Sequence, residues 1–238
     1  MIPWQLLDTA EIPGGGKLRL MKRGGEFSIM LGDNELMNSR VSGSETALAV
    51  SACARLENRP RPQILIGGLG MGFTLRAALD ALGPEARVTV AELVPAVVAW
   101  ARGPMAEIFQ ASLSDPRVLI REEDVGNLIR AGRSSYDAIL LDVDNGPEGL
   151  TREANDSLYE GEGLQAARNA LSPGGVLAVW SSAPDRRFSE RLRRAGFAVD
   201  ETGARANRAG RGARHVIWLA TRTDESNAAQ ARRRPKAG

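Results

Sequence analysis

The segment that decides the fold spans residues 64–74 and reads ILIGGLGMGFT. Its first three residues form an apolar run, which is typical of a strand buried on both faces of a parallel sheet. Four glycines within six residues follow, and Phe73-Thr74 continue into a stretch with helical spacing. Because glycines lack Cβ atoms, a ligand can approach the backbone of this turn closely. The segment therefore predicts a strand, a ligand-binding turn and a helix.

Downstream of this segment, apolar runs alternate with helical stretches, as in right-handed βαβ units. The strands are expected at Ile64–Gly67, Val88–Glu92, Val118–Ile120, Ala138–Asp142, Val176–Ser181, Ala198–Asp200 and His215–Ala220. The helices are expected at Gly72–Leu82, Pro95–Phe109, Asp124–Ala131, Glu153–Leu171 and Asp185–Ala195. This order predicts an α/β fold with a mostly parallel, Rossmann-like sheet. Its ligands are expected at the carboxyl ends of the strands.

Upstream, residues 17–22 and 26–31 alternate polar and apolar side chains around Gly24-Gly25, which predicts a β-hairpin. Ser42 and Glu45 then have the spacing of a capping box, so a helix is expected from this point. We expect a small β-rich element with a linking helix over residues 1–62. The main domain is expected over 63–222, and a disordered basic tail over 223–238.

Composition excludes several classes of function. The single cysteine, Cys53, allows no internal disulfide, and no cluster of Cys and His offers a metal site. Without residues 223–238 the chain carries 27 basic and 27 acidic side chains, so its body is neutral and nucleic-acid binding is not expected. There is no secretory signal pattern and no apolar run of membrane-spanning length. We therefore expect a cytoplasmic protein that binds no membrane.

Acidic residues end the strands after the glycine turn. Glu92 closes the second strand, 22 residues after Gly70, where an acid in nucleotide-binding folds accepts hydrogen bonds from ribose hydroxyls. Asp124 follows the third strand, where an acid can accept a bond from an exocyclic adenine amine. The next residues, Leu93 and Val125, are expected to line the same site. Each acid alone is explained by a strand end or a helix cap, but their succession predicts an adenosine site.

The glycine spacing separates the candidate cofactors. Gly67, Gly68, Gly70 and Gly72 give G-G-x-G-x-G rather than the G-x-G-x-x-G of dinucleotide sites, and no basic residue stands nearby to meet phosphates. A phosphate-binding Walker loop needs Lys followed by Ser or Thr, whereas this chain has Phe73-Thr74. The loop therefore favours an adenosine without phosphates.

The fourth predicted strand supplies candidate catalytic acids in the segment YDAILLDVDNGPE, residues 136–148. Asp142 should emerge at the mouth of the cofactor site, and Asp144 and Glu148 follow on a turn. Such carboxylates can hold a cationic amine and accept its proton. A turn alone explains Asn145-Gly146, but it does not explain an acid at the end of an apolar strand. Asp142 and Asp144 are therefore the predicted catalytic residues, and Asp142 is also expected to contact the cofactor.

Two further residues have less specific interpretations. Trp180, at the end of the fifth strand, either walls the pocket or packs in the core. His215 heads the last strand, and a structural role is expected for it.

From about Gln63 to Leu177 the chain resembles the spermidine synthase-like family, polyamine aminopropyltransferases on the class I S-adenosylmethionine-dependent methyltransferase fold. The matching pieces are GGLGMG (67–72), VAELVPAVVAWA (90–101), the acid after the third strand, YDAILLDVDNGP (136–147) and LSPGGVLAV (171–179). The resemblance implies that Glu92 binds ribose, that Asp124 binds the adenine amine and that Asp142 is the catalytic acid beside the acceptor amine.

One departure from the family pattern determines which transfer reaction we expect. The family usually carries an Asp in the glycine loop, which grips the ammonium of decarboxylated S-adenosylmethionine, and Gly70 stands there instead. A neutral loop suits the α-carboxylate of intact S-adenosylmethionine. We therefore expect a transferase that methylates a small, cationic amine. Two alternatives stay open: an aminopropyltransferase using decarboxylated S-adenosylmethionine, and a non-catalytic adenosyl-binding protein. A monomer or a homodimer also stays open.

Overall fold

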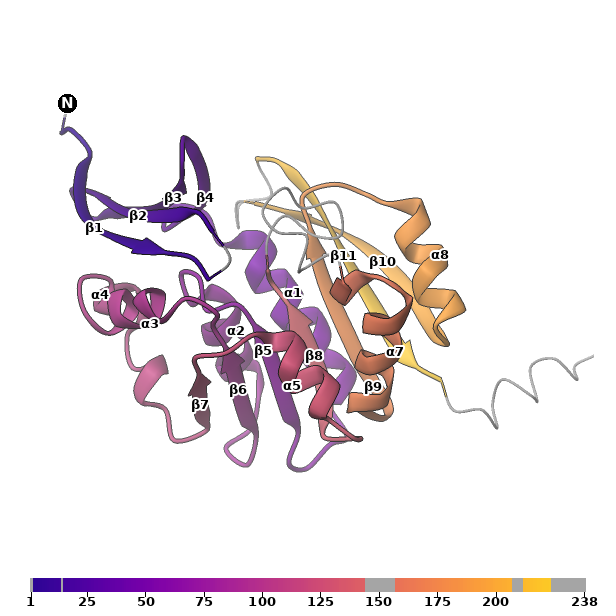
Figure 1. Ribbon diagram of the computed structural model, residues 1–238. Helices are drawn as coiled ribbons and strands as arrows, with labels where there is room; N and C mark the ends of the chain where they lie inside the picture. The colour runs from indigo at the N-terminus through magenta and orange to yellow at the C-terminus, as the bar shows by residue number, and fades with distance from the viewer. Residues whose placement is uncertain (1, 14, 144–156, 207–211, 224–238) are drawn as a thin grey trace, which may run out of the picture.

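The computed structural model describes residues 2–13, 15–143, 157–206 and 212–223. Its main feature is a seven-stranded sheet in the order β10-β11-β9-β8-β5-β6-β7 (Figure 1). The strands are β5 (Gln63–Gly67), β6 (Arg87–Ala91), β7 (Val118–Arg121), β8 (Tyr136–Leu141), β9 (Leu171–Ser181), β10 (Phe197–Arg205) and β11 (Arg214–Arg222). The first five run parallel, and β11 is antiparallel to both β9 and β10. The predicted mostly parallel α/β sheet is confirmed.

The strand order reverses beside β5, which pairs with β6 on one side and β8 on the other. In doubly wound sheets the crevice at such a switch point is the usual ligand site. Strands β5 and β8 are almost wholly buried, because their apolar residues face helices on both sides of the sheet. The glycine turn leaves β5 at this crevice.

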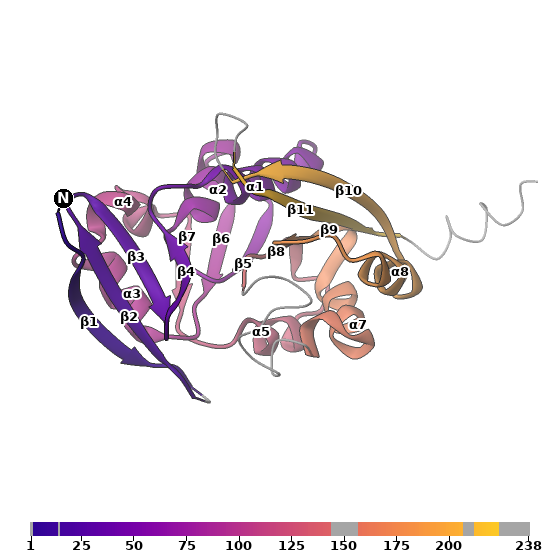
Figure 2. The same cartoon turned by 90° about the horizontal axis from the view of Figure 1, so that it is seen from above.

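Helices cover both faces of the sheet (Figure 2). They are α1 (Gly43–Cys53), α2 (Phe73–Ala81), α3 (Pro95–Arg102), α4 (Ala106–Phe109), α5 (Val125–Ala131), α7 (Gly161–Ala170) and α8 (Arg186–Arg194), with short 3-10 turns at Ala54–Leu56 and Ser112–Ser114. Buried residues of α1, α2 and α3 share one core with Ile64 and Ile66 of β5. Those of α5, α7 and α8 share a second core with Leu65 on the opposite face.

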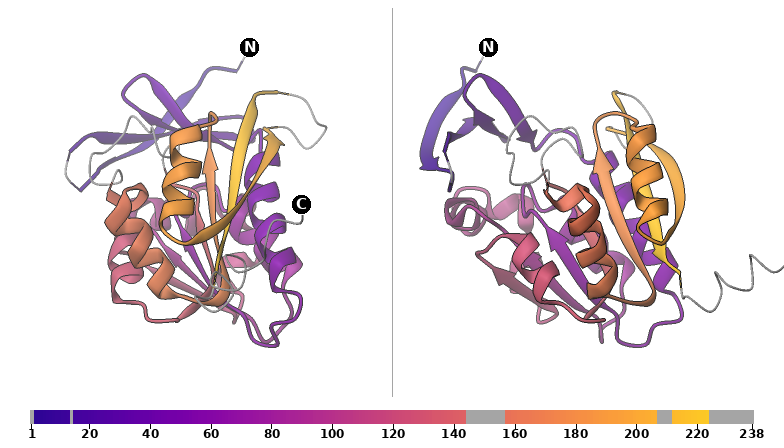
Figure 3. Two further views of the ribbon diagram at one scale, coloured as in Figure 1. Left: turned by 90° about the vertical axis from the view of Figure 1, so that its right-hand side faces the viewer. Right: turned by 45° about the vertical axis from the view of Figure 1, so that its right-hand side comes forward.

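A four-stranded antiparallel sheet precedes the main sheet. It consists of β1 (Gln5–Glu11), β2 (Lys17–Arg23), β3 (Glu26–Leu31) and β4 (Asn34–Asn38). The predicted hairpin is β2–β3, and the sequence did not single out β1 or β4. Leu20 and Ile29 are fully buried in the core that contains α1 and α2. The small sheet thus lies over the glycine-turn edge of the main sheet (Figure 1, Figure 3).

Several predicted bounds were wrong. The helix predicted over Pro95–Phe109 is two helices, because the chain leaves helical geometry at Gly103. Strand β9 begins at Leu171, ahead of the predicted Val176, since its Pro-Gly-Gly segment does not read as a strand. Strand β10 is also longer than predicted, because its middle is polar and exposed.

Other expectations are not tested. The start of the predicted helix Glu153–Leu171 and the tail from residue 224 lie outside the described residues, and the domain limits stay predictions. Among the described residues, no helix is long and apolar enough to cross a membrane.

Candidate functional site

The glycine turn brings β5 against the end of β8. Gly68 has a φ of +88°, and a Cβ there would lie 2.6 Å from the main-chain oxygen of Asp142. The Asp142 N–H in turn donates to the main-chain oxygen of Gly67 at 3.1 Å. Only glycine allows this approach without strain. The turn then enters α2 at Gly72, its N-cap.

Two adjoining pockets open at this edge of the sheet. We name them the Glu92 pocket and the Glu45 pocket. They share Leu36 and Met37 of β4, Gly70 of the turn, and Asp142. The Glu92 pocket is lined by Ile12, Leu18, Leu31, Leu36, Met37, Gly68, Gly70, Ala91, Glu92, Leu93, Val94, Asp124, Val125, Asp142 and Val143. The small sheet therefore forms one wall of the site.

Glu92 follows β6, and its side chain is buried. Its Oε2 accepts the N–H of Leu69 at 2.9 Å, and its Oε1 accepts the N–H of Val94 at 2.9 Å. Burial raises the pKa of this carboxyl, and the backbone N–H groups oppose that rise. Glu92 also lines the pocket, so its carboxylate is the acceptor that we expect ribose hydroxyls to meet.

Asp124 combines the two interpretations weighed for it. It is the N-cap of α5, where its Oδ1 accepts the N–H of Gly126 at 2.7 Å. It also lines the Glu92 pocket beside Val125, and Leu93 lines the same pocket. The cap uses Oδ1, and Oδ2 is the oxygen that we expect to meet an adenine amine.

Asp142 lies between the two pockets, as expected for an acid at the end of β8. Thr74 Oγ1 donates to its Oδ2 at 2.6 Å. Burial and then the negative charge of Glu45 raise the pKa of Asp142 to about 7, while the Thr74 hydrogen bond opposes them. An acid with this pKa exchanges a proton readily near neutral pH. Asp144 and Glu148 lie outside the described residues.

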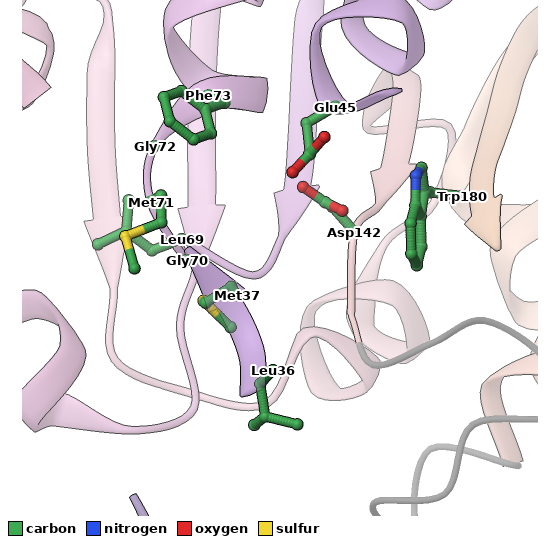
Figure 4. A pocket seen from close by; sticks show the side chains of 10 residues that line it. All are labelled: Leu36, Met37, Glu45, Leu69, Gly70, Met71, Gly72, Phe73, Asp142 and Trp180. Carbon is green, nitrogen blue, oxygen red and sulfur yellow. The ribbon is translucent and has the colours of Figure 1, made fainter. Parts of the chain in front are cut away.

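Glu45 is the residue that the sequence interpretation missed. The predicted capping box is wrong, because the Ser42 side chain makes no capping bond. Glu45 Oε2 instead accepts the hydroxyl of Ser44 at 2.7 Å. Its carboxylate points toward that of Asp142 (Figure 4). The capping pattern gave this acid a local explanation and so concealed it.

The Glu45 pocket is completed by Leu69, Met71, Phe73 and Trp180 (Figure 4). Trp180 thus fits both of its predicted interpretations, because it lines this pocket and also packs against the core. Its ring meets that of His215 edge-on, with centroids 4.8 Å apart. Burial lowers the pKa of His215, and the charge of Glu45 opposes this.

Sequence comparisons find polyamine aminopropyltransferases. The chain is 34% identical over 127 residues to polyamine aminopropyltransferase 1 of Streptomyces coelicolor, covering 52% of this chain and 23% of that protein. It is 32% identical over 146 residues to the polyamine aminopropyltransferase of Mycobacterium tuberculosis, covering 57% and 27%. The chain therefore matches about a quarter of the length of these relatives. No protein-family model matches the chain.

Structural comparisons extend the likeness over nearly the whole chain. Spermidine synthase from Thermotoga maritima superposes with a TM-score of 0.71 at 16% identity, covering 98% of this chain and 81% of that one. A spermidine synthase in complex with the transition-state analogue AdoDATO gives a TM-score of 0.70 at 17% identity, covering 98% and 79%. At such identities the superpositions establish the fold, while the sequence matches identify the relatives. The chain therefore has the fold of the spermidine synthases, and about half of its length is similar in sequence to polyamine aminopropyltransferases.

Proposed function

We propose that the protein transfers the aminopropyl group of decarboxylated S-adenosylmethionine to a small amine. The observation that carries this is the pair of carboxylates, Glu45 and Asp142, that face each other beside the adenosine-type Glu92 pocket. Among the described residues that line the two pockets, none is Lys, Arg or His. The α-carboxylate of intact S-adenosylmethionine would therefore meet negative charge without a cationic partner.

This proposal takes the alternative from the sequence analysis ahead of methyl transfer. The expectation of methyl transfer depended on Gly70, which makes the loop neutral. Glu45 returns a negative charge to the pocket from a different element, so a neutral loop no longer favours the intact donor. The aminopropyltransferase relatives support the same choice.

The residues of the two pockets have different roles in the proposed reaction. Glu92 and Asp124 hold the adenosine, and the small sheet covers it. The acceptor nitrogen attacks the arm carbon bonded to sulfur, a C–N bond replaces the C–S bond, and methylthioadenosine leaves. Asp142 takes the proton that the new secondary amine releases, a role suited to its pKa of about 7. The two fixed pockets contribute chiefly by aligning donor and acceptor.

Product analysis tests this function. The protein is incubated with decarboxylated S-adenosylmethionine and a panel of diamines, polyamines and guanidino amines, with intact S-adenosylmethionine in parallel. We expect methylthioadenosine and an aminopropylated amine by mass spectrometry. S-adenosylhomocysteine with a methylated amine would instead establish the methyl-transfer alternative. Tight adenosyl binding with neither product would establish the non-catalytic one. Cytoplasmic location and a homodimer stay predictions.

A further inference from the structure

We infer that Glu45 of α1 holds the ammonium of the donor's aminopropyl arm, so that this helix, rather than the glycine loop, selects decarboxylated S-adenosylmethionine. The inference rests on the proposed function and assigns a donor-binding role to a residue outside the glycine loop, the segment where the family usually carries its acid.

The loop itself cannot supply the charge. Gly70 has a φ of +51°, and a Cβ added there would lie 3.2 Å from the sulfur of Met37. A side chain on the loop would therefore crowd the Met37 sulfur of β4, which would have to shift by a few tenths of an ångström, on a backbone conformation that favours glycine. At this point the pocket wall is a neutral backbone and a thioether.

Glu45 reaches the same cavity from the other side. It lines one pocket with Gly70, Met71 and Phe73, and this pocket joins the Glu92 pocket at Gly70 and Asp142. A donor whose adenosine lies against Glu92 would therefore extend its arm past Gly70 toward Glu45 (Figure 4). Glu45 stands where the end of that arm is expected.

No cationic side chain pairs with Glu45 among the described residues. Within this part of the chain, neither Glu45 nor Asp142 belongs to an ion pair, and their side chains accept hydrogen bonds from the hydroxyls of Ser44 and Thr74. The field of Glu45 raises the pKa of Asp142 and opposes the lowered pKa of His215. Burial makes the larger contribution to the raised pKa of Asp142, and an ammonium beside Glu45 would offset the smaller contribution of Glu45 and so favour the charged, proton-accepting form of Asp142.

The backbone fixes Glu45 in place. The N–H of Gly43 donates to the main-chain oxygen of Ala206 at 2.7 Å, which ties the start of α1 to the end of β10. Leu48 and Ala49, one turn further along, are fully buried. The carboxylate therefore projects from an anchored helix, and little freedom is lost when it binds a cation.

Calorimetry on the Glu45→Gln variant tests the inference, with methylthioadenosine and decarboxylated S-adenosylmethionine as ligands. The first ligand has no amine arm, whereas the second has one. We expect the variant to bind methylthioadenosine as the parent does and to bind the decarboxylated donor about 10- to 100-fold more weakly, the usual effect of losing a charged hydrogen bond. Glu162→Gln, an exposed acid in the first turn of α7, is the matched control and should change neither affinity.

The other outcomes are decisive as well. Unchanged donor affinity with a raised KM for the acceptor would overturn the inference and assign Glu45 to the acceptor amine. Equal loss of both ligands would overturn it in favour of a structural role. Failure of the parent protein to bind methylthioadenosine would overturn the proposed function itself. As a second variant, Gly70→Asp with Met37→Ala should restore donor affinity to Glu45→Gln, because it returns an acid to the loop and gives it room.

Discussion

The two pockets that meet at Asp142 use their carboxylates differently. In the Glu92 pocket the acids are already bonded to backbone N–H groups, since Glu92 holds two amides and Asp124 caps a helix. In the Glu45 pocket the two acids face each other and have hydroxyl partners. The first arrangement suits a neutral, hydroxylated ligand recognised by shape and hydrogen bonds. The second leaves negative charge that a cation can balance.

The largest effect is expected for a substitution of Asp142, which should change the rate of the reaction but not the binding of adenosine. Asp142→Asn removes the proton acceptor and should lower kcat about 10²- to 10⁴-fold. Its affinity for methylthioadenosine should stay close to that of the parent, because Glu92 and Asp124 are the proposed acceptors for the ribose and the adenine. Steady-state kinetics and calorimetry measure the two quantities. Full activity of this variant would remove Asp142 from the mechanism.

The next effect concerns the Glu92 pocket alone. Glu92→Ala should weaken methylthioadenosine binding by about 1.5 to 3 kcal/mol, because it removes a charged acceptor for the ribose hydroxyls. Glu122→Ala, which removes an exposed acid just after β7, is the control and should leave calorimetric affinity unchanged. Wild-type affinity in Glu92→Ala would refute the ribose assignment.

The unbalanced charge of the Glu45 pocket also predicts a dependence of stability on pH. The folded pKa of Asp142, raised to about 7 from 3.8 by burial and by Glu45, makes its charged form costly above pH 7. Asp142→Asn should therefore stabilise the empty protein by about 1 to 3 kcal/mol at pH 8. The gain should fade as the pH falls from 7 toward 4, since the parent carboxyl then becomes protonated in the unfolded state as well as in the folded state.

Urea denaturation at pH 8 and pH 4.5 measures this gain. Asp115→Asn gives the opposite sign as a control, because the Arg117 guanidinium lowers the pKa of Asp115 and the charged form stabilises the fold. That substitution should lower stability at pH 8, and its effect should shrink as acid protonates the parent. The same sign in both variants would contradict the assignment of charge to the Glu45 pocket.

The smallest effect tests the double role of Asp124. Asp124→Ala should cost about 0.5 to 2 kcal/mol of unfolding free energy through loss of the helix cap. Asp185→Ala removes the same kind of cap from α8, where Oδ1 accepts the N–H of Arg187 at 2.7 Å. Both variants should lose stability in urea, Asp185→Ala the more because Asp185 also pairs with Arg191 at 3.3 Å, but only Asp124→Ala should also bind methylthioadenosine more weakly. Equal ligand affinity would reduce Asp124 to a cap.

The two pockets also differ in how much of each could be predicted from the sequence. Glu92, Asp124 and Asp142 each end or follow an apolar strand, and parallel strands bring such ends to one edge, so their placement could be predicted. Glu45 and Met37 come from a helix and a small-sheet strand whose packing no local pattern records. Short β4, with the sequence NELMN, has no clear alternation. The expectation of methyl transfer came from considering Gly70 without the neighbours that tertiary packing gives it.

The contact between Met37 and Gly70 also restricts how the protein can change over evolutionary time. A Gly70→Asp substitution in the present chain brings a Cβ to 3.2 Å from the Met37 sulfur, on a backbone with a φ of +51°. A smaller residue at position 37 would relieve this contact, so the loop accommodates an acid more easily once Met37 has been replaced. The effect of an acid at position 70 therefore depends on which residue already stands at position 37.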